Sequence, residues 1–200
     1  SVLENMRKVD YPNLDQHGHI YLDFTGAGLY ARSQVQKHQD LLKNNVFGNP
    51  HSSNPTSLAA TRLIERTRET ILTFFNADPQ EYVCIITNNA SGALKLVGES
   101  YPFSANSHYL LTYDNHNSVN GIREFARAKG AQINYIPVLL PDLQMDQQEL
   151  SCQLKNISPD THSLFAYPAQ SNFSGVQHSL EWIQVAQEAG WEVLLDAAAF

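Results

Sequence analysis

Short apolar runs alternate with segments of helical periodicity along this chain, and this alternation constrains its fold more than any other feature. Apolar runs predict strands at residues 20–23, 82–87, 107–113, 132–138, 162–167 and 191–196. Apolar side chains spaced three or four residues apart predict helices at residues 33–45, 57–75, 90–100, about 119–126, 145–154 and about 180–186. Strands that alternate with helices form a mostly parallel sheet covered on both faces, so we expect an α/β sandwich.

Glycine positions support the predicted boundaries. Gly130 and Gly190 each follow a predicted helix and precede a predicted strand, where a glycine commonly ends a helix. The N-terminal part differs, with a short strand, a Gly-rich turn and a polar loop at residues 44–54. We therefore predict that residues 1–55 pack beside the main sheet and that residues 56–200 form the main domain.

The composition excludes several classes of protein. Hydrophobic residues make up 42% and charged residues 16%, which is typical of a globular chain with a core. The 13 Lys and Arg against 20 Asp and Glu give a net charge of −7, which argues against binding to nucleic acid or to an anionic membrane. No apolar run has the roughly 18 residues that a membrane span requires, so we expect no membrane segment.

The two cysteines and the N-terminus indicate a cytoplasmic protein. Cys84 and Cys152 are too few for a disulfide framework and wrongly spaced for zinc. Cys84 lies in a predicted strand, so we expect it in the core. The first residues show no basic segment followed by an apolar one, so no signal peptide is predicted.

Four polar loops each follow a predicted strand. They are residues 87–92 (TNNASG), 113–118 (YDNHNS), 168–175 (PAQSNFSG) and 196–199 (DAAA). A parallel sheet brings the carboxyl ends of its strands to one edge, where open α/β sheets bind their ligands. We therefore expect the four loops to form one site.

The first two loops offer an anion site and an imidazole. Small residues before the helix at 90–100 let a ligand approach its free N–H groups, which favour phosphate. The alternative is ordinary helix capping by Asn88, Asn89 or Ser91. His116 can stack on a flat ligand or transfer a proton, and the alternative is an exposed histidine in a capping loop.

The other two loops offer amides, hydroxyls and a carboxylate. Residues 168–175 carry more polar side chains than one turn requires, although a polar turn closed by Gly175 is the alternative. Asp196 ends a buried strand and needs a cation or a hydrogen-bond donor, unless it caps the next element. A phosphate, a stacked ring and a cation that faces a carboxylate are all present in pyridoxal phosphate (PLP).

The ordered motifs resemble the class V aminotransferase family, the fold-type-I PLP group that contains the cysteine desulfurases. Within it, the chain is most similar to the aminotransferase-like domain of molybdenum cofactor sulfurases. The likeness covers nearly all of the chain from Ile20. The motifs that carry it are residues 21–23 (YLD), 48–52 (GNPHS), 89–91 (NAS), 115–124 (NHNSVNGIRE), 168–175 (PAQSNFSG) and 195–199 (LDAAA).

This resemblance implies the roles of the cofactor-binding residues. Backbone N–H groups around Asn89, Ala90 and Ser91, with the Ser91 hydroxyl, would hold the PLP phosphate. The remaining groups would contact the ring: His116 on its face, with a possible role in proton transfer, Asn172 at the phenolic oxygen and Asp196 at the pyridinium nitrogen.

The resemblance also implies a substrate and an assembly. Loops that contain Thr25 with Gly26, and Asn49 with His51, would border the substrate, often across a dimer interface. A protein of this kind is a PLP-dependent enzyme that mobilises sulfur from L-cysteine, and we expect a homodimer. The chain would cover the N-terminal segment and most of the large PLP-binding domain, which is incomplete at its C-terminal end.

Three departures from the family pattern qualify this prediction: the place of the lysine, the place of the arginine and cysteine, and the residue at position 199. The Schiff-base lysine, the substrate-carboxylate arginine and the persulfide-forming cysteine are expected beyond Phe200. Ala199 stands where cysteine desulfurases usually carry a glutamine, which favours the branch of the molybdenum cofactor sulfurases.

Other functions have weaker support. A degenerate protein that keeps the PLP fold without the lysine is one alternative. A dinucleotide-binding protein is another, since residues 26–31 (GAGLYA) match a loose glycine fingerprint, but no βαβ unit surrounds them. A serine hydrolase would require a Gly-x-Ser-x-Gly motif, which is absent. His17 and His19 lack a supporting cluster of carboxylates or cysteines, so no metal site is predicted.

Overall fold

The computed structural model describes residues 1–155, 157 and 161–200, which form two compact units. The first unit contains Ser1–Leu22 and Leu29–Ile86. The second contains Asp23–Gly28 and Thr87–Phe200. The predicted division at residue 55 refers to the domains of the complete protein and remains a prediction.

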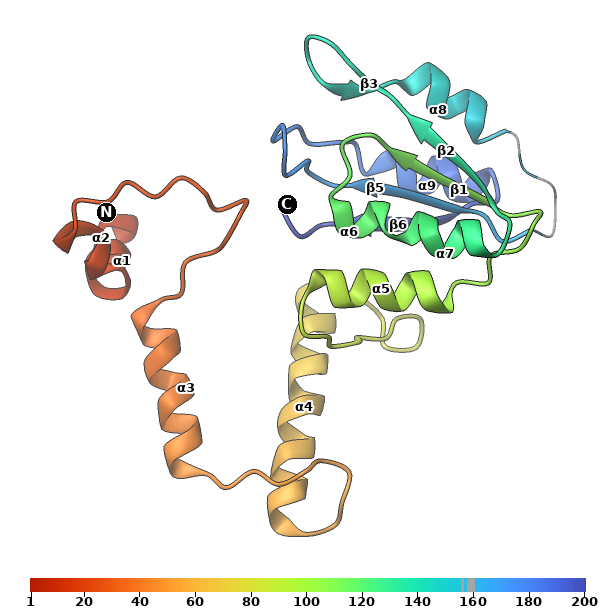
Figure 1. The fold of residues 1–200 in the computed structure, drawn as a ribbon. Helices are drawn as coiled ribbons and strands as arrows, with labels where there is room; N and C mark the ends of the chain where they lie inside the picture. Colours follow the sequence, from red (N-terminus) through yellow and green to blue (C-terminus); the bar gives the residue numbers. More distant parts are fainter. Residues whose placement is uncertain (156, 158–160) are drawn as a thin grey trace. The chain divides into compact units, whose positions relative to one another are not determined.

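Four helices form the regular structure of the first unit (Figure 1). Two were not predicted, α1 (Val2–Asp10) and α2 (Pro12–Gln16), whereas α3 (Arg32–Asn44) and α4 (Pro55–Phe74) match predicted helices. The start of α4 follows from its sequence, because the Asn54 side chain accepts a hydrogen bond from the Ser57 amide. Pro55 occupies the first turn, where its missing N–H has no consequence.

The second unit is built on a parallel sheet of four strands. Its order is β2 (Gln132–Ile136), β1 (His108–Thr112), β5 (Leu164–Pro168) and β6 (Glu192–Asp196), and each pair of neighbours is parallel. All four strands were predicted. A separate antiparallel pair, β3 (Val138–Leu139) with β4 (Gln144–Met145), was not.

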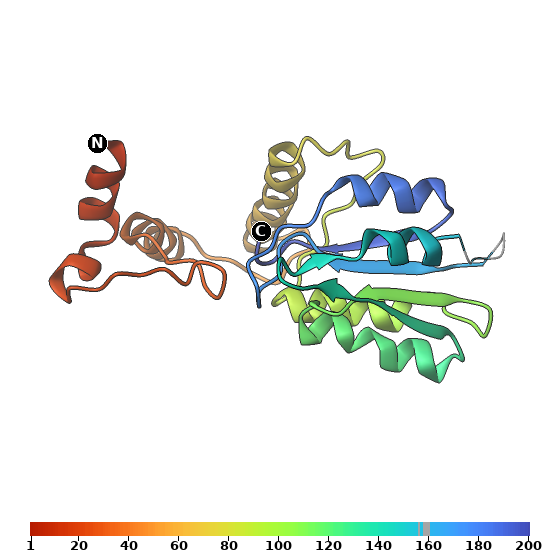
Figure 2. The same ribbon diagram turned by 90° about the horizontal axis from the view of Figure 1, so that it is seen from above.

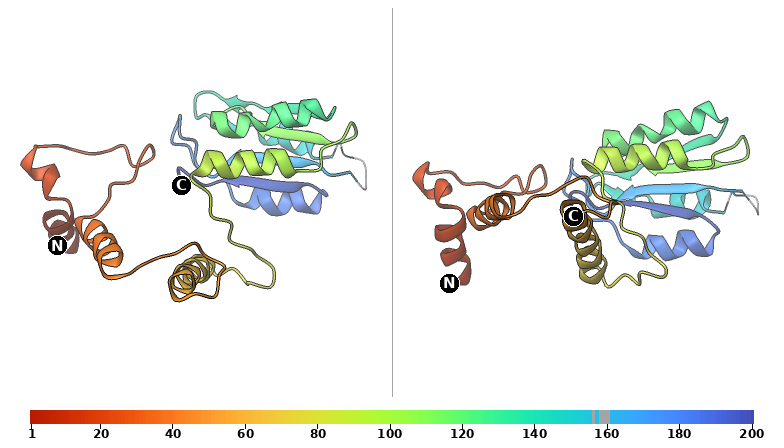
Figure 3. Two further views of the ribbon diagram at one scale, coloured as in Figure 1. Left: turned by 60° about the horizontal axis from the view of Figure 1, so that its bottom comes forward. Right: turned by 90° about the horizontal axis from the view of Figure 1, so that it is seen from below.

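Helices cover both faces of this sheet, as predicted (Figures 1 and 2). One face carries α5 (Ala90–Ser100), α6 (Asn117–Asn120) and α7 (Ile122–Ala128). The other carries α8 (Gln147–Gln153) and α9 (Glu181–Glu188), and Figure 3 shows the same layers from two further sides. Successive residues of β1 alternate between the two cores, since Tyr109 and Leu111 pack in one and Leu110 in the other. A strand buried on both faces therefore reads as a continuous apolar run.

Two of the predicted strands are wrong. Residues 20–23 and 82–87 form no strand, and the side chains of Tyr82, Val83, Ile85 and Ile86 are exposed. An apolar run becomes a strand only where another strand supplies hydrogen-bond partners, and the described residues supply none here. Cys84 accordingly lies half-buried outside any strand, which corrects the expectation that it belongs to the core.

The predicted helix-ending glycines are confirmed. Gly130 and Gly190 have φ angles of 81° and 88°, the left-handed conformation that glycine adopts without strain. Each follows the end of a helix, α7 or α9, and leads into β2 or β6. Among the described residues, no helix combines the length and the apolar character needed to cross a membrane.

Candidate functional site

The strand order of the second unit creates a crevice between two neighbouring strands. After β1 the chain passes to α6 and α7 on one face, whereas after β5 it passes to α9 on the other face. The loops that follow β1 and β5 therefore diverge at the carboxyl edge of the sheet. Such a switch point is where open α/β sheets bind ligands.

A cavity of about 270 Å³ lies at this edge. Its volume is near the lower end of the range for small-molecule sites, about 300–1,000 Å³. All of its lining residues belong to the second unit. They are Asp23, Thr25, Gly26, Ala90, Ser91, Leu94, His116, Ser118, Pro168, Gln170, Asn172, Asp196, Ala198 and Ala199. Each of the four polar loops contributes to this set, as the sequence predicted.

The first loop places the start of α5 at the cavity. Asn89 caps the helix, because its Oδ1 accepts a hydrogen bond of 2.8 Å from the Gly92 amide. Asn89 itself does not line the cavity, whereas Ala90 and Ser91 do. Helix geometry gives the first amides no intrahelical acceptor, so those of Ala90 and Ser91 are suited to bind an anion.

A second hydroxyl lies beside Ser91. The Oγ atoms of Ser91 and Ser118 are 2.6 Å apart, and both residues line the cavity. Ser118 was not identified from the sequence, although it stands within the predicted loop at residues 113–118. The two loops after different strands therefore present adjacent hydroxyl groups to the same space.

The second loop presents His116. This residue precedes α6, and its Nδ1 accepts a hydrogen bond of 3.2 Å from the Ser118 amide. In the neutral imidazole, the proton is therefore on Nε2. The ring is exposed and lines the cavity, so the capping role and the predicted ligand contact are compatible.

The third loop presents Asn172 at the tip of a closed turn. The Ser171 amide donates to the Val176 carbonyl at 2.9 Å, and Ser171 Oγ accepts from the amides of Phe173 and Ser174. An isolated bridge between Gln170 and Gln177 closes the base of the turn. Ser171 is thus used structurally, whereas the exposed side chain of Asn172 remains at the cavity.

The fourth loop contributes the carboxylate of Asp196. This residue ends β6, beside Pro168 at the end of β5. Its Oδ1 accepts a hydrogen bond of 3.0 Å from the Ala198 amide, which is a partner that the sequence did not identify. The half-buried carboxylate lines the cavity, so it caps the following turn and also faces the ligand space.

The predicted substrate-bordering residues divide between the two units. Thr25 and Gly26 line the cavity, beside Asp23, whose Oδ1 accepts from the Gly26 amide at 3.1 Å. Asn49 and His51 belong to the first unit. Their place at the substrate remains a prediction.

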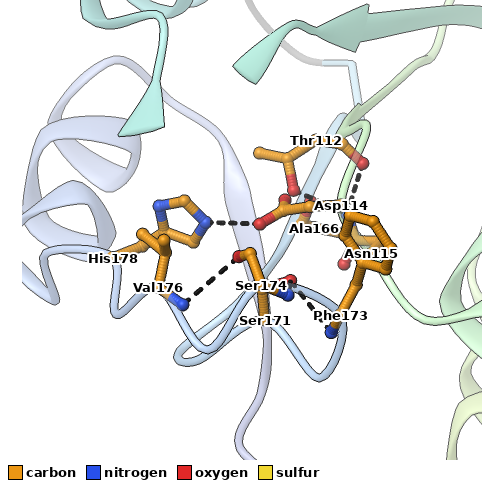
Figure 4. A network of polar contacts seen from close by, with 9 residues as sticks. All are labelled: Thr112, Asp114, Asn115, Ala166, Ser171, Phe173, Ser174, Val176 and His178. Carbon is orange, nitrogen blue, oxygen red and sulfur yellow. Dashed lines mark hydrogen bonds and ion pairs between the residues drawn. The ribbon is translucent and has the colours of Figure 1, made fainter. Parts of the chain in front are cut away.

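A buried hydrogen bond between a histidine and a carboxylate beneath the loops was missed by the sequence analysis. Nε2 of His178 lies 2.8 Å from Oδ2 of Asp114, and the side chains are 1% and 4% exposed (Figure 4). Burial by itself raises the pKa of Asp114, but hydrogen bonds from His178 and Thr112 outweigh it and leave this pKa below its usual value. Asp114 is therefore a carboxylate at neutral pH.

Comparison with known families agrees with this geometry. The model of the Aminotransferase class-V family matches residues 20–200. The chain belongs to this family. The predicted family is thereby confirmed, and the match includes all four loops that line the cavity.

Curated proteins similar to this member of the class-V family are molybdenum cofactor sulfurases. One from Oryza sativa subsp. japonica is 38% identical, with 98% of this chain and 27% of the relative covered. One from Homo sapiens is also 38% identical, with 92% of this chain and 22% of the relative covered. The chain thus spans about a quarter of the length of these relatives.

Solved structures of cysteine desulfurases share the fold. The apo enzyme of Thermococcus onnurineus NA1 has a TM-score of 0.79 at 24% identity, with 97% of this chain and 47% of that chain covered. CsdA of Escherichia coli has a TM-score of 0.73 at 21% identity, with 96% and 47% covered. These likenesses confirm the predicted α/β architecture of fold type I.

Proposed function

We propose that this chain forms the N-terminal segment and most of the large domain of a PLP-dependent enzyme that mobilises sulfur from L-cysteine. One observation carries the proposal: an anion-binding helix start, an imidazole, an amide and a carboxylate converge on one cavity. The similarity to molybdenum cofactor sulfurases supports sulfur transfer as the activity of the complete protein.

The residues present fit the chemical groups of PLP. The amides of Ala90 and Ser91, with the hydroxyls of Ser91 and Ser118, match a phosphate. The carboxylate of Asp196 matches the pyridinium nitrogen, and the amide of Asn172 matches the phenolic oxygen. Asn89 acts on the phosphate through the helix start that it caps, rather than by direct contact.

Each residue has a distinct task in this proposal. PLP, when bound, supplies an electron sink that stabilises a carbanion of the amino acid. Asp196 holds the proton on the ring nitrogen and so maintains that capacity. His116 covers one face of the ring and excludes water from it. Because its Nδ1 accepts from the Ser118 amide, its Nε2 is the atom available for proton transfer.

The proposal extends to substrate and assembly. L-cysteine is the substrate that we assign, with Thr25 and Gly26 beside it and with Asn49 and His51 bordering it in the assembled protein. We assign a cytoplasmic homodimer. Ala199 lines the cavity where a glutamine is usual in cysteine desulfurases, which leaves the phenolic oxygen to Asn172.

Borohydride reduction of the complete protein tests this function. Reduction in the presence of PLP, followed by peptide mass spectrometry, should identify a pyridoxyl-lysine outside residues 1–200. A separate, unreduced sample incubated with L-cysteine should yield alanine and protein-bound sulfane sulfur. Bound PLP without a lysine adduct would instead support a degenerate binding protein, and a protein that binds no PLP would refute the proposal.

A further inference from the structure

The two loops that present His116 and Asn172 belong to opposite sides of the crevice. The chain continues from the first into α6 and from the second into α9, and these helices cover different faces of the sheet. The two loops therefore leave the sheet toward opposite faces. A side-chain contact between the two loops would fix their separation beyond what the pairing of β1 with β5 provides.

The buried hydrogen bond between Asp114 and His178 is such a connection. Asp114 lies two residues before His116, and His178 lies six residues after Asn172. Their side chains meet at 2.8 Å although 64 residues separate them, and both are almost fully buried. Neither residue lines the cavity. Figure 4 shows the pair with the turn that contains Ser171, Phe173 and Ser174.

His178 is fixed firmly to the turn that carries Asn172. Its amide donates to the Ala169 carbonyl at 3.0 Å, and the bridge between Gln170 and Gln177 lies directly beside it. The whole turn is closed by further hydrogen bonds at Ser171. Any displacement of His178 therefore shifts the turn at residues 170–177, which carries Asn172.

Asp114 is equally fixed to the loop that carries His116. Its neighbour Asn115 donates from Nδ2 to the Thr112 carbonyl, the Thr112 hydroxyl and the Ala166 carbonyl, all at 3.0 Å. The Asn115 carbonyl accepts from Asn120 Nδ2 at 3.1 Å. These hydrogen bonds attach the start of the loop to β1 and β5. Asp114, through its hydrogen bond to His178, also attaches the loop to the turn after β5.

We propose that Asp114 and His178 are positioning residues that set the separation of the two cavity loops and thereby the placement of His116 against Asn172. A buried charge is costly unless it is paired, so the pair resists separation more strongly than a neutral contact would. The link to cofactor geometry rests on the proposed PLP function. The contact between the two loops is independent of that proposed function.

The alternative is that the pair only anchors the turn at residues 170–178. Hydrogen exchange in the complete protein, without added PLP, separates the two roles. His178→Phe removes the partner of Asp114 from the later loop. Asp114→Asn keeps the shape of the side chain but removes its charge from the earlier loop. The matched control is Trp191→Phe, which deletes a buried hydrogen bond of 2.9 Å to the Leu154 carbonyl at the opposite edge of the sheet.

Positioning predicts that each substitution acts on the loop that it does not belong to. His178→Phe should raise amide exchange at residues 115–120 at least threefold, and Asp114→Asn should do the same at residues 171–177. Trp191→Phe should change neither segment. Unchanged exchange at residues 115–120 in His178→Phe would mean that the pair anchors only the turn at residues 170–178, and it would overturn the proposal whichever cofactor the protein binds.

A spectroscopic measurement extends the test to the cofactor. With PLP bound, each single variant should alter the visible circular dichroism of the cofactor and raise its dissociation constant about tenfold. The double variant should show no larger effect than His178→Phe alone, because both substitutions act through the same connection. Additive effects would contradict the proposal. A wild-type protein that binds no PLP would refute the proposed function, while the exchange experiment would still decide the link between the loops.

Discussion

Ser91 and Ser118 bring their hydroxyl oxygens to 2.6 Å although 27 residues separate them along the chain. Ser91 stands in the first turn of α5, and Ser118 stands in α6, two residues after His116. The contact therefore joins the anion-binding helix start to the loop that carries the imidazole. A phosphate at this helix start would find two hydroxyl groups beside the free amides.

Ser118→Ala should weaken PLP binding without unfolding the protein. One hydrogen bond contributes about 0.5–1.5 kcal/mol, or up to about 3 kcal/mol when one partner is charged, so we expect a rise of about 2- to 160-fold in the dissociation constant. Equilibrium dialysis of the complete protein measures it. Ser151→Ala is the matched control, because Ser151 is exposed on α8 and its hydroxyl donates to the Gln147 carbonyl of the same helix. Equal affinities for all three proteins would remove Ser118 from the phosphate site.

The parallel sheet and its covering helices were predictable because a strand that is buried on both faces is a continuous apolar run in the sequence. β1 and β5 are continuous apolar runs, and the predicted helix at residues 90–100 coincides with α5. The apolar run at residues 82–87 led to a wrong strand prediction, since apolar composition does not reveal whether a neighbouring strand is available. α1 was missed although Val2, Met6 and Val9 recur at helical spacing, a short apolar stripe that the sequence analysis did not use and that is exposed in the described residues.

The candidate site was predictable as a set of loops but not as a set of contacts. Asp196, His116 and Asn172 each follow a strand, and a parallel sheet brings such positions together. His178 and Ser118 carried no comparable signal. Their roles depend on partners 64 and 27 residues away, and only the folded chain determines which side chains meet at those distances.

Asp196→Asn should abolish most of the turnover while preserving the fold. The asparagine oxygen can still accept from the Ala198 amide, whereas the negative charge that would hold the ring nitrogen protonated is lost. We expect kcat for alanine formation from L-cysteine to fall by about 100-fold or more, as when one preorganised electrostatic contact is removed. Asp142→Asn, at an exposed turn, is the control. A variant at residue 196 with normal kcat would show that its carboxylate has no such role.

Gly98→Ala should destabilise the second unit, in contrast to Gly92→Ala in the same helix. A Cβ atom at position 98 would lie 2.7 Å from Cδ2 of Phe125, whereas one at position 92 would meet its nearest atom at 3.6 Å. Both changes favour the helix, so their difference reports overpacking between α5 and α7, which typically costs about 1–3 kcal/mol. Thermal unfolding of the complete protein measures the difference. Equal midpoints would mean that Phe125 moves aside at no cost.

Asp114→Asn should make the protein less sensitive to acid. The pKa of Asp114 is lower in the folded chain than its usual value, because hydrogen bonds from His178 and Thr112 outweigh the effect of burial. The folded state therefore binds this proton less readily than the unfolded state. Asp114 contributes stability above the unfolded pKa of about 3.9, and this contribution is lost as the pH falls through the lowered folded value. Unfolding midpoints of the wild type and the variant should differ most above about pH 5 and converge below about pH 4. Midpoints that stay equally far apart from pH 3 to pH 7 would contradict this account of Asp114.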